Sequence, residues 1–275
     1  MREVDVRLAD GSMLHAYDVP AAHRPRLTLA WHHGSPQTGA PLPPVIEAAA
    51  ERGIRVFSYA RPAYGGSDAR TGRDVASAAA DVAAVADALG IGRFAAMGAS
   101  GGAPHALASA ALLPERVPAV VTLAGIAPFT TDFDWFAGMA SPDGIRSAFD
   151  GRAARAAFEE TAEFDPAQFL PVDYAALEGP WSSLGDDVAR AGEFGMAGLI
   201  DDDVAFARPW GFELADVPVP VLVVQGEEDR VVPRSHGEWM ARQLPRARLV
   251  LRPGDGHISV LAALPDALDW LLRQV

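Results

Sequence analysis

Residues 94–102 read Phe-Ala-Ala-Met-Gly-Ala-Ser-Gly-Gly, and the interpretation of the whole chain starts from this stretch. A short apolar run, typical of a buried strand, leads directly into a match to the pattern G-x-S-x-G at residues 98–102, and a helical stretch follows. A serine on such a sharp strand-to-helix turn is held in a strained backbone conformation, and glycines on either side remove Cβ atoms that would clash. The pattern therefore predicts Ser100 as a nucleophile supported by Gly98 and Gly102, although a plain glycine-rich turn is an alternative reading.

Strands and helices alternate on both sides of this turn. The N-terminal residues are predicted to form a hairpin around Asp10-Gly11-Ser12. The other predicted strands are 27–31, 54–58, 94–97, 119–123, 219–224 and 248–251, and the predicted helices between them are 43–52, 75–89, 103–113, 235–244 and 262–273. Alternation of this kind predicts an α/β fold with a mostly parallel sheet that is covered on both faces.

The middle of the chain has a different pattern. Residues 126–214 show helical periodicity, as at 153–163 and 188–196, several prolines and no strong strand. Between Ala127 and Glu213 there are 17 acidic residues and 5 Arg, so nearly all of the net charge of −13 lies here. We therefore expect a separate helical unit inserted into the α/β domain.

This segment leaves two questions open. Its acidity either selects a cationic substrate or belongs to a solvated surface, and we expect the latter. Its aromatic side chains either line an apolar pocket or form the core of the insert. These aromatic residues are Phe129, Phe133, Trp135, Phe136, Trp181 and Trp210.

Composition excludes several kinds of chemistry. The 275 residues contain no cysteine, and all 23 basic residues are Arg. A cysteine nucleophile, a thiolate zinc site, a lysine Schiff base and a phosphate-binding P-loop lysine are therefore excluded. The acidic net charge argues against a nucleic-acid partner. No metal-binding spacing appears, so we expect neither a metal nor a cofactor.

With no membrane span and no apolar leader evident, a cytoplasmic protein acting on a small molecule is expected. The sequence leaves the oligomeric state open.

A serine hydroxyl needs a base, because it is almost wholly protonated at neutral pH. Of the seven histidines, His257 lies in the loop after the last predicted strand, where an open parallel sheet gathers its site. Asp229 follows the preceding predicted strand and is the candidate to orient the imidazole. The chain order Ser100, Asp229, His257 fits the order found with a G-x-S-x-G turn.

The other histidines are assigned different roles. His15 and His23 are expected to be exposed, and His236 to open a surface helix. His105 follows the motif on its helix and is expected to pack, while His33 is expected to be a structural hydrogen-bonding residue.

Acyl transfer also needs donors for an oxyanion. The amide that follows the nucleophile, that of Gly101, is one candidate. The turn His33-Gly34-Ser35-Pro36 comes after an earlier strand, and the amide of Ser35 is the candidate for the second.

Together these stretches resemble the α/β-hydrolase fold superfamily, in its serine-nucleophile branch of esterases and proline iminopeptidases. The stretches are H-G-S-P at 33–36, R-P-A-Y-G-G-S at 61–67, G-A-S-G-G at 98–102, G-E-E-D at 226–229 and G-D-G-H at 254–257. The match to the iminopeptidase loop is partial, because Ser35 stands where a glycine is expected.

The resemblance implies an eight-stranded, mostly parallel sheet flanked by helices, with residues 1–125 and 215–275 as core and 126–214 as a helical cap. It implies Ser100 as nucleophile, His257 as base and Asp229 as orienting carboxylate. The expected activity is that of a serine hydrolase, most similar to the carboxylesterases of class EC 3.1.1, which cleaves a small carboxylic ester. An aminopeptidase, a C–C bond hydrolase, a cofactor-free perhydrolase and a non-catalytic binding protein remain alternatives.

Overall fold

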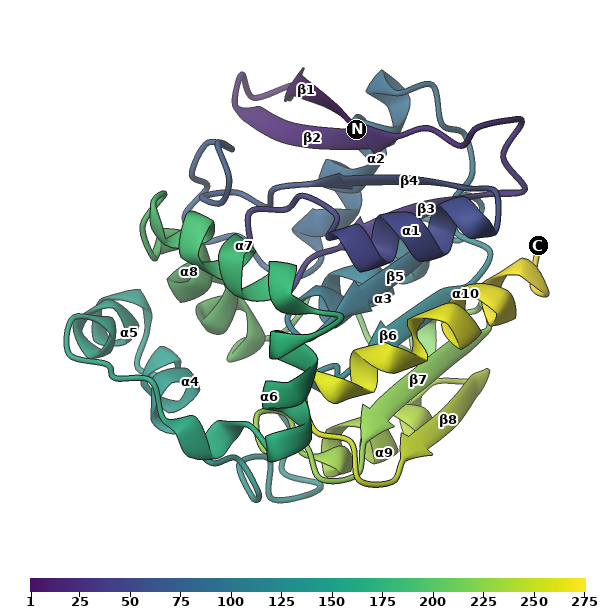
Figure 1. The fold of residues 1–275 in the computed structure, drawn as a ribbon. Coiled ribbons are helices and arrows are strands. Elements are labelled where there is room, and N and C mark those ends of the chain that lie inside the picture. Colours follow the sequence, from purple (N-terminus) through teal and green to yellow (C-terminus); the bar gives the residue numbers. More distant parts are fainter.

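A computed structural model describes all 275 residues and contains one eight-stranded sheet, as predicted (Figure 1). The strand order across the sheet is β1-β2-β4-β3-β5-β6-β7-β8. The pairs β1–β2 and β2–β4 are antiparallel, and all the others are parallel. The strands are β1 (Arg2–Arg7), β2 (Met13–Val19), β3 (Leu27–His32), β4 (Ile54–Tyr59), β5 (Ala95–Ala99), β6 (Val120–Leu123), β7 (Val221–Gly226) and β8 (Ala247–Arg252).

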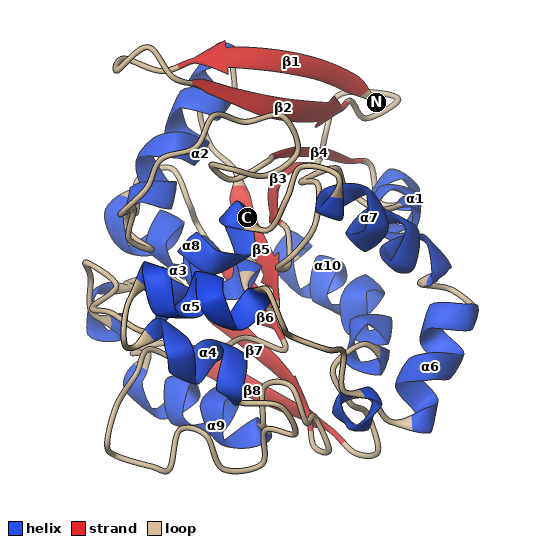
Figure 2. Ribbon diagram, turned by 90° about the vertical axis from the view of Figure 1, so that its left-hand side faces the viewer, coloured by secondary structure: helices blue, strands red, loops and turns tan.

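Helices cover both faces of the sheet. Helices α1 and α10 lie on one face and α2, α3 and α9 on the other (Figure 2). Each face has its own apolar core, and the central strands β5, β6 and β7 are buried throughout because both of their faces are covered. These helices are α1 (Pro43–Glu51), α2 (Ser77–Ala88), α3 (Gly102–Leu112), α9 (Arg234–Gln243) and α10 (Leu264–Leu272).

The chain between β6 and β7 holds five further α-helices. They are α4 (Asp143–Ala148), α5 (Arg152–Glu159), α6 (Pro171–Glu178), α7 (Ser182–Gly192) and α8 (Ala197–Phe206). Helices α4, α5 and α8 pack together, as do α6 and α7, and in Figure 2 the two groups lie on opposite sides of the strand ends. The helical stretch predicted at 153–163 overlaps α5, and that at 188–196 overlaps the second half of α7, although both helices begin and end earlier than predicted.

No helix in the structure has both the length and the apolar character that a membrane crossing requires.

Candidate active site

The turn between β5 and α3 carries Ser100 in a strained conformation. Its backbone φ is +51°, in the left-handed region that residues with a side chain rarely adopt. A Cβ atom on Gly98 would overlap the carbonyl oxygen of Gly102, and one on Gly102 would overlap that of His32. The two glycines therefore permit the close approach of β3, β5 and α3 that places Ser100 at the carboxyl end of the sheet.

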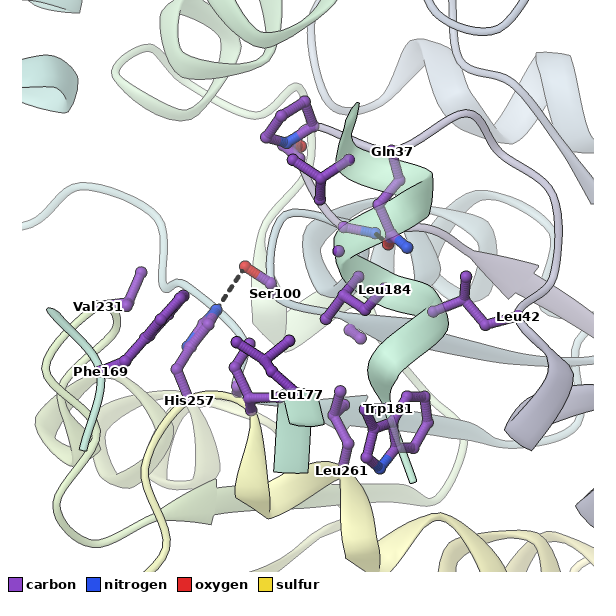
Figure 3. A pocket seen from close by; sticks show the side chains of 18 of the residues that line it. Gln37, Leu42, Ser100, Phe169, Leu177, Trp181, Leu184, Val231, His257 and Leu261 are labelled. Carbon is purple, nitrogen blue, oxygen red and sulfur yellow. Dashed lines mark hydrogen bonds between the residues drawn. The ribbon is translucent and has the colours of Figure 1, made fainter. Parts of the chain in front are cut away.

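The side chains of Ser100, His257 and Asp229 form one hydrogen-bonded chain. The Nε2 atom of His257 lies 3.0 Å from the Oγ of Ser100 (Figure 3), and its Nδ1 lies 2.8 Å from the Oδ2 of Asp229. The three residues follow the carboxyl ends of β5, β8 and β7, respectively. A parallel sheet brings these ends together, so residues predicted from three separate motifs meet at one point.

The carboxylate of Asp229 is held in place from its other side. Its Oδ1 accepts hydrogen bonds from the backbone N–H groups of Val231 and Val232, at 2.8 and 2.9 Å. The side-chain amide of Gln225 donates to Oδ2 at 3.1 Å. These donors fix the carboxylate so that Oδ2 faces the imidazole of His257, which sets the tautomer with a proton on Nδ1.

The pKa of His257 is raised above its ordinary value. Burial by itself would lower this pKa, but the charge of Asp229 and its hydrogen bond, together with the charge of Asp173, outweigh burial. The imidazole of His257 therefore binds a proton more readily than that of a free histidine.

The candidate oxyanion donors, Ser35 and Gly101, are neighbours. A Cβ atom on Gly101 would meet the Oγ of Ser35. Their backbone N–H groups donate to no acceptor within the protein, and both residues line a cavity that Ser100 also lines. Two free amide donors beside a serine hydroxyl are the groups that oxyanion stabilisation needs.

Two cavities meet at Ser100. The larger has a volume of about 370 Å³, and none of its 21 lining residues is Asp, Glu, Lys or Arg. Leu177, Trp181 and Leu184 of the α6–α7 group line it, together with Phe169 (Figure 3). Its size and apolar lining are typical of a small-molecule site.

The smaller cavity, of about 220 Å³, lies on the side of α4, α5 and α8. Its lining includes Arg155, Asp203 and Arg230. Arg155 is already paired with Asp203 at 2.6 Å and with Glu159 at 2.7 Å. The two cavities therefore differ in polarity, and a molecule that spans Ser100 would place one part in each.

The aromatic residues of the insert divide between the two predicted roles. Trp181 lines the large cavity, but Trp135 packs against Phe129 and Phe136 outside it. Sequence reasoning missed Phe164 and Phe169, which line the cavity and follow no periodic pattern.

The acidic residues of the insert are not all solvated, contrary to expectation. Asp173, Asp187, Asp201 and Asp202 are at most 4% exposed, and none of them lines either cavity. Of the 17 acidic residues in the block, Asp203 is the one that lines either of these two cavities.

Asp202 on α8 belongs to a buried ionic cluster that sequence reasoning missed. Its carboxylate binds the guanidinium groups of Arg61 at 2.7 Å and Arg73 at 2.5 Å, and it accepts hydrogen bonds from the hydroxyls of Tyr64 and Ser35. Burial alone would raise the pKa of Asp202, but the two guanidinium groups outweigh burial and hold that pKa well below its usual range. No local pattern signalled this cluster, because Ser35 and Asp202 are 167 positions apart.

Three of the other histidines, His33, His105 and His236, are buried. His33 donates from Nδ1 to the carbonyl of Gly34 and accepts at Nε2 from the amide of Arg61, as expected of a structural residue. His105 is buried, as expected. The surface position predicted for His236 was wrong: it is fully buried, because Trp135 and Phe133 of the insert cover it.

No three His, Asp or Glu side chains converge in a way that would hold a metal ion.

Comparisons with known proteins agree with this architecture. Residues 29–263 match the alpha/beta hydrolase fold family. The chain is 30% identical over 227 residues to a pimeloyl-[acyl-carrier protein] methyl ester esterase of Nitrosomonas europaea, which covers 79% of this chain and 83% of the relative. It is also 30% identical over 254 residues to a non-heme chloroperoxidase of Streptomyces lividans, covering 90% of each. A crystal structure of a hydrolase from Pseudomonas aeruginosa superposes with a TM-score of 0.76 at 23% identity, over 99% of this chain and 98% of the other. The chain therefore belongs to the alpha/beta hydrolase fold family.

Proposed function

We propose that this protein is a serine hydrolase that cleaves a carboxylic ester of a small molecule through an acyl-enzyme intermediate. The observation that carries the proposal is the hydrogen-bonded chain from Ser100 through His257 to Asp229 at the junction of two cavities.

In the first half of the reaction, His257 Nε2 takes the proton of Ser100 as Oγ attacks the ester carbonyl carbon. The amides of Ser35 and Gly101 stabilise the negative charge on the carbonyl oxygen. The imidazolium then gives its proton to the departing alcohol, and the acyl group remains on Ser100.

In the second half, His257 deprotonates a water molecule that attacks the acyl-enzyme. The carboxylic acid leaves and Ser100 regains its proton. Asp229 keeps the proton of the neutral imidazole on Nδ1 and stabilises the imidazolium in both halves.

The large cavity supports an ester with an uncharged, apolar group. No charged side chain lines that cavity, so a cation there would lose its hydration without gaining a partner. The cationic substrate considered from the acidity of the insert is therefore disfavoured.

A perhydrolase is the second candidate, and the similarity to a chloroperoxidase favours it. In that case hydrogen peroxide replaces water as the acceptor of the acyl group, and a peracid replaces the carboxylic acid. The residues and their roles stay the same.

The test is hydrolysis of p-nitrophenyl esters from acetate to decanoate by the wild type and by Ser100→Ala, with and without hydrogen peroxide. Ester hydrolysis that the substitution abolishes supports the esterase. Peracid formation that exceeds hydrolysis supports the perhydrolase. If no ester is cleaved, amino-acid arylamides and C–C substrates are the next assays, and the esterase proposal fails.

A further inference from the structure

The carboxylate of Asp173, on α6 of the insert, binds the loop that carries His257. Its Oδ1 accepts hydrogen bonds from the backbone N–H groups of Ile258 at 2.9 Å and Ser259 at 2.8 Å, and from the Ser259 hydroxyl at 2.8 Å. On the other side of the base, a Cβ atom on Gly256 would overlap this same carboxylate. Asp173 thus packs against the residues immediately before and after His257.

This carboxylate is fully buried, and no cation lies within ion-pair distance of it. Its second oxygen accepts the backbone N–H of Leu170 at 3.0 Å, so four neutral donors solvate the charge. The other buried aspartates of the insert all have arginine partners: Asp187 pairs with Arg190, Asp201 with Arg152, and Asp202 with two arginines. An unpaired buried anion is costly, and a nearby imidazolium would offset part of that cost.

We propose that Asp173 is a positioning residue for the base, which holds the His257 loop and supplies a second negative charge that stabilises the imidazolium formed when Ser100 loses its proton. The proposal rests on the serine-hydrolase function proposed above. This role would connect the insert to the chemistry, because His257 is correctly positioned only when helix α6 contacts its loop.

The charges around His257 are few. The carboxylates of Asp229 and Asp173 both raise its pKa. Arg252 and Asp255, at the start of the loop, are paired with each other. Glu227, whose backbone N–H donates to the carbonyl of Arg252, pairs with Arg234 at 3.7 Å. The remaining charged side chains on the elements packed against the loop reach solvent, and they are Glu178, Glu228, Arg230, Arg248, Asp266 and Asp269.

The decisive variant is Asp173→Asn, which keeps the shape and one oxygen acceptor but removes the charge. Asp187→Asn is the matched control: Asp187 is equally buried on the neighbouring helix α7, but it binds Gln37 and Thr38 rather than the His257 loop. The two variants lose the same charge from the same insert, so a difference between them at His257 reports the position of that charge.

The first readout is the imidazole titration of His257 by NMR, assigned by comparison with His257→Gln. We expect a lower titration midpoint in Asp173→Asn and an unchanged midpoint in Asp187→Asn. This readout needs no turnover, so it remains informative even if the serine-hydrolase proposal fails.

The second readout is the pH dependence of kcat/KM for p-nitrophenyl butyrate. In Asp173→Asn we expect the acidic limb to move to lower pH and the plateau to fall roughly three- to tenfold, because the imidazolium is less stabilised. Asp173→Ser is a second uncharged variant if Asp173→Asn does not fold. A folded uncharged variant whose His257 titrates as in the wild type would overturn the proposal.

Discussion

The hydroxyl of Ser35 donates a hydrogen bond of 2.5 Å to the Oδ2 of Asp202, which joins the loop after β3 to helix α8 of the insert. The guanidinium of Arg61 contacts both residues, since it donates to the Ser35 hydroxyl at 2.8 Å and pairs with Asp202. The candidate oxyanion loop is therefore held by a buried charge that lies far away in the sequence.

Replacing Asp202 by Asn tests this arrangement. The substitution leaves two buried guanidinium groups, those of Arg61 and Arg73, without a counter-charge, and we expect a loss of about 3–5 kcal/mol of unfolding free energy. Asp150→Asn, at an exposed position of the insert with no hydrogen bond or ion pair to its side chain, is expected to change stability by less than about 0.5 kcal/mol. Urea unfolding at pH 7 measures both. Equal stability of the two variants would show that the cluster does not hold the fold together.

Much of the fold was predictable because its signals are local. Buried parallel strands form continuous apolar runs, and β7 is one whose six residues are all buried. The strained turn at Ser100 requires glycine on both sides, so its sequence pattern is distinctive. Asp229 and His257 directly follow strands, and parallel strands place such residues together.

The failures share one cause, which is contact between distant parts of the chain. His236 lies among polar residues on α9, and its burial comes from aromatic side chains about 100 positions earlier, such as Trp135. Asp173 and Asp202 look like ordinary surface acids in a helical segment. Apart from the backbone N–H of Leu170, which donates to Asp173, their donors lie 85 to 167 positions away, so no local pattern distinguishes them.

Acid is expected to destabilise the protein. Burial lowers the pKa of His32 to about 3 and that of His236 to about 4, and it holds the pKa values of His33 and His105 well below normal. Below the ordinary histidine pKa of 6.5, these four imidazoles are therefore protonated in the unfolded chain but stay neutral in the folded protein. Burial raises the pKa of Asp203 to about 6, so one proton binds to the folded state first and opposes the effect.

The net difference of three protons predicts a loss of roughly 4 kcal/mol of unfolding free energy per pH unit near pH 5. Stability is fully present above the histidine pKa of the unfolded chain and falls as pH decreases toward the folded values. Urea unfolding at pH 7, 6 and 5 measures the slope. A constant free energy over this range would mean that the four imidazoles take up protons without unfolding.

The volume of the large cavity predicts that esters with longer acyl chains are accepted. A larger side chain in the lining of that cavity should remove this acceptance. Leu184 on α7 lines that cavity, and Leu184→Trp would fill part of its volume. We expect kcat/KM for p-nitrophenyl octanoate to fall about tenfold or more, while that for the acetate changes much less. Val172→Trp, at an exposed position on α6, is the control and is expected to retain the wild-type profile. An equal loss on both esters in Leu184→Trp would argue that the cavity does not hold the apolar group.

Covalent labelling tests whether Ser100 is a nucleophile that His257 activates. The wild type, Ser100→Ala and His257→Gln would be treated with a fluorophosphonate probe at neutral pH and analysed by mass spectrometry of the tryptic peptides. We expect stoichiometric labelling at Ser100 in the wild type, none in Ser100→Ala, and labelling slowed by about a hundredfold or more in His257→Gln. A folded wild-type protein that stays unlabelled, or that is labelled at another residue, would show that Ser100 is not an activated nucleophile.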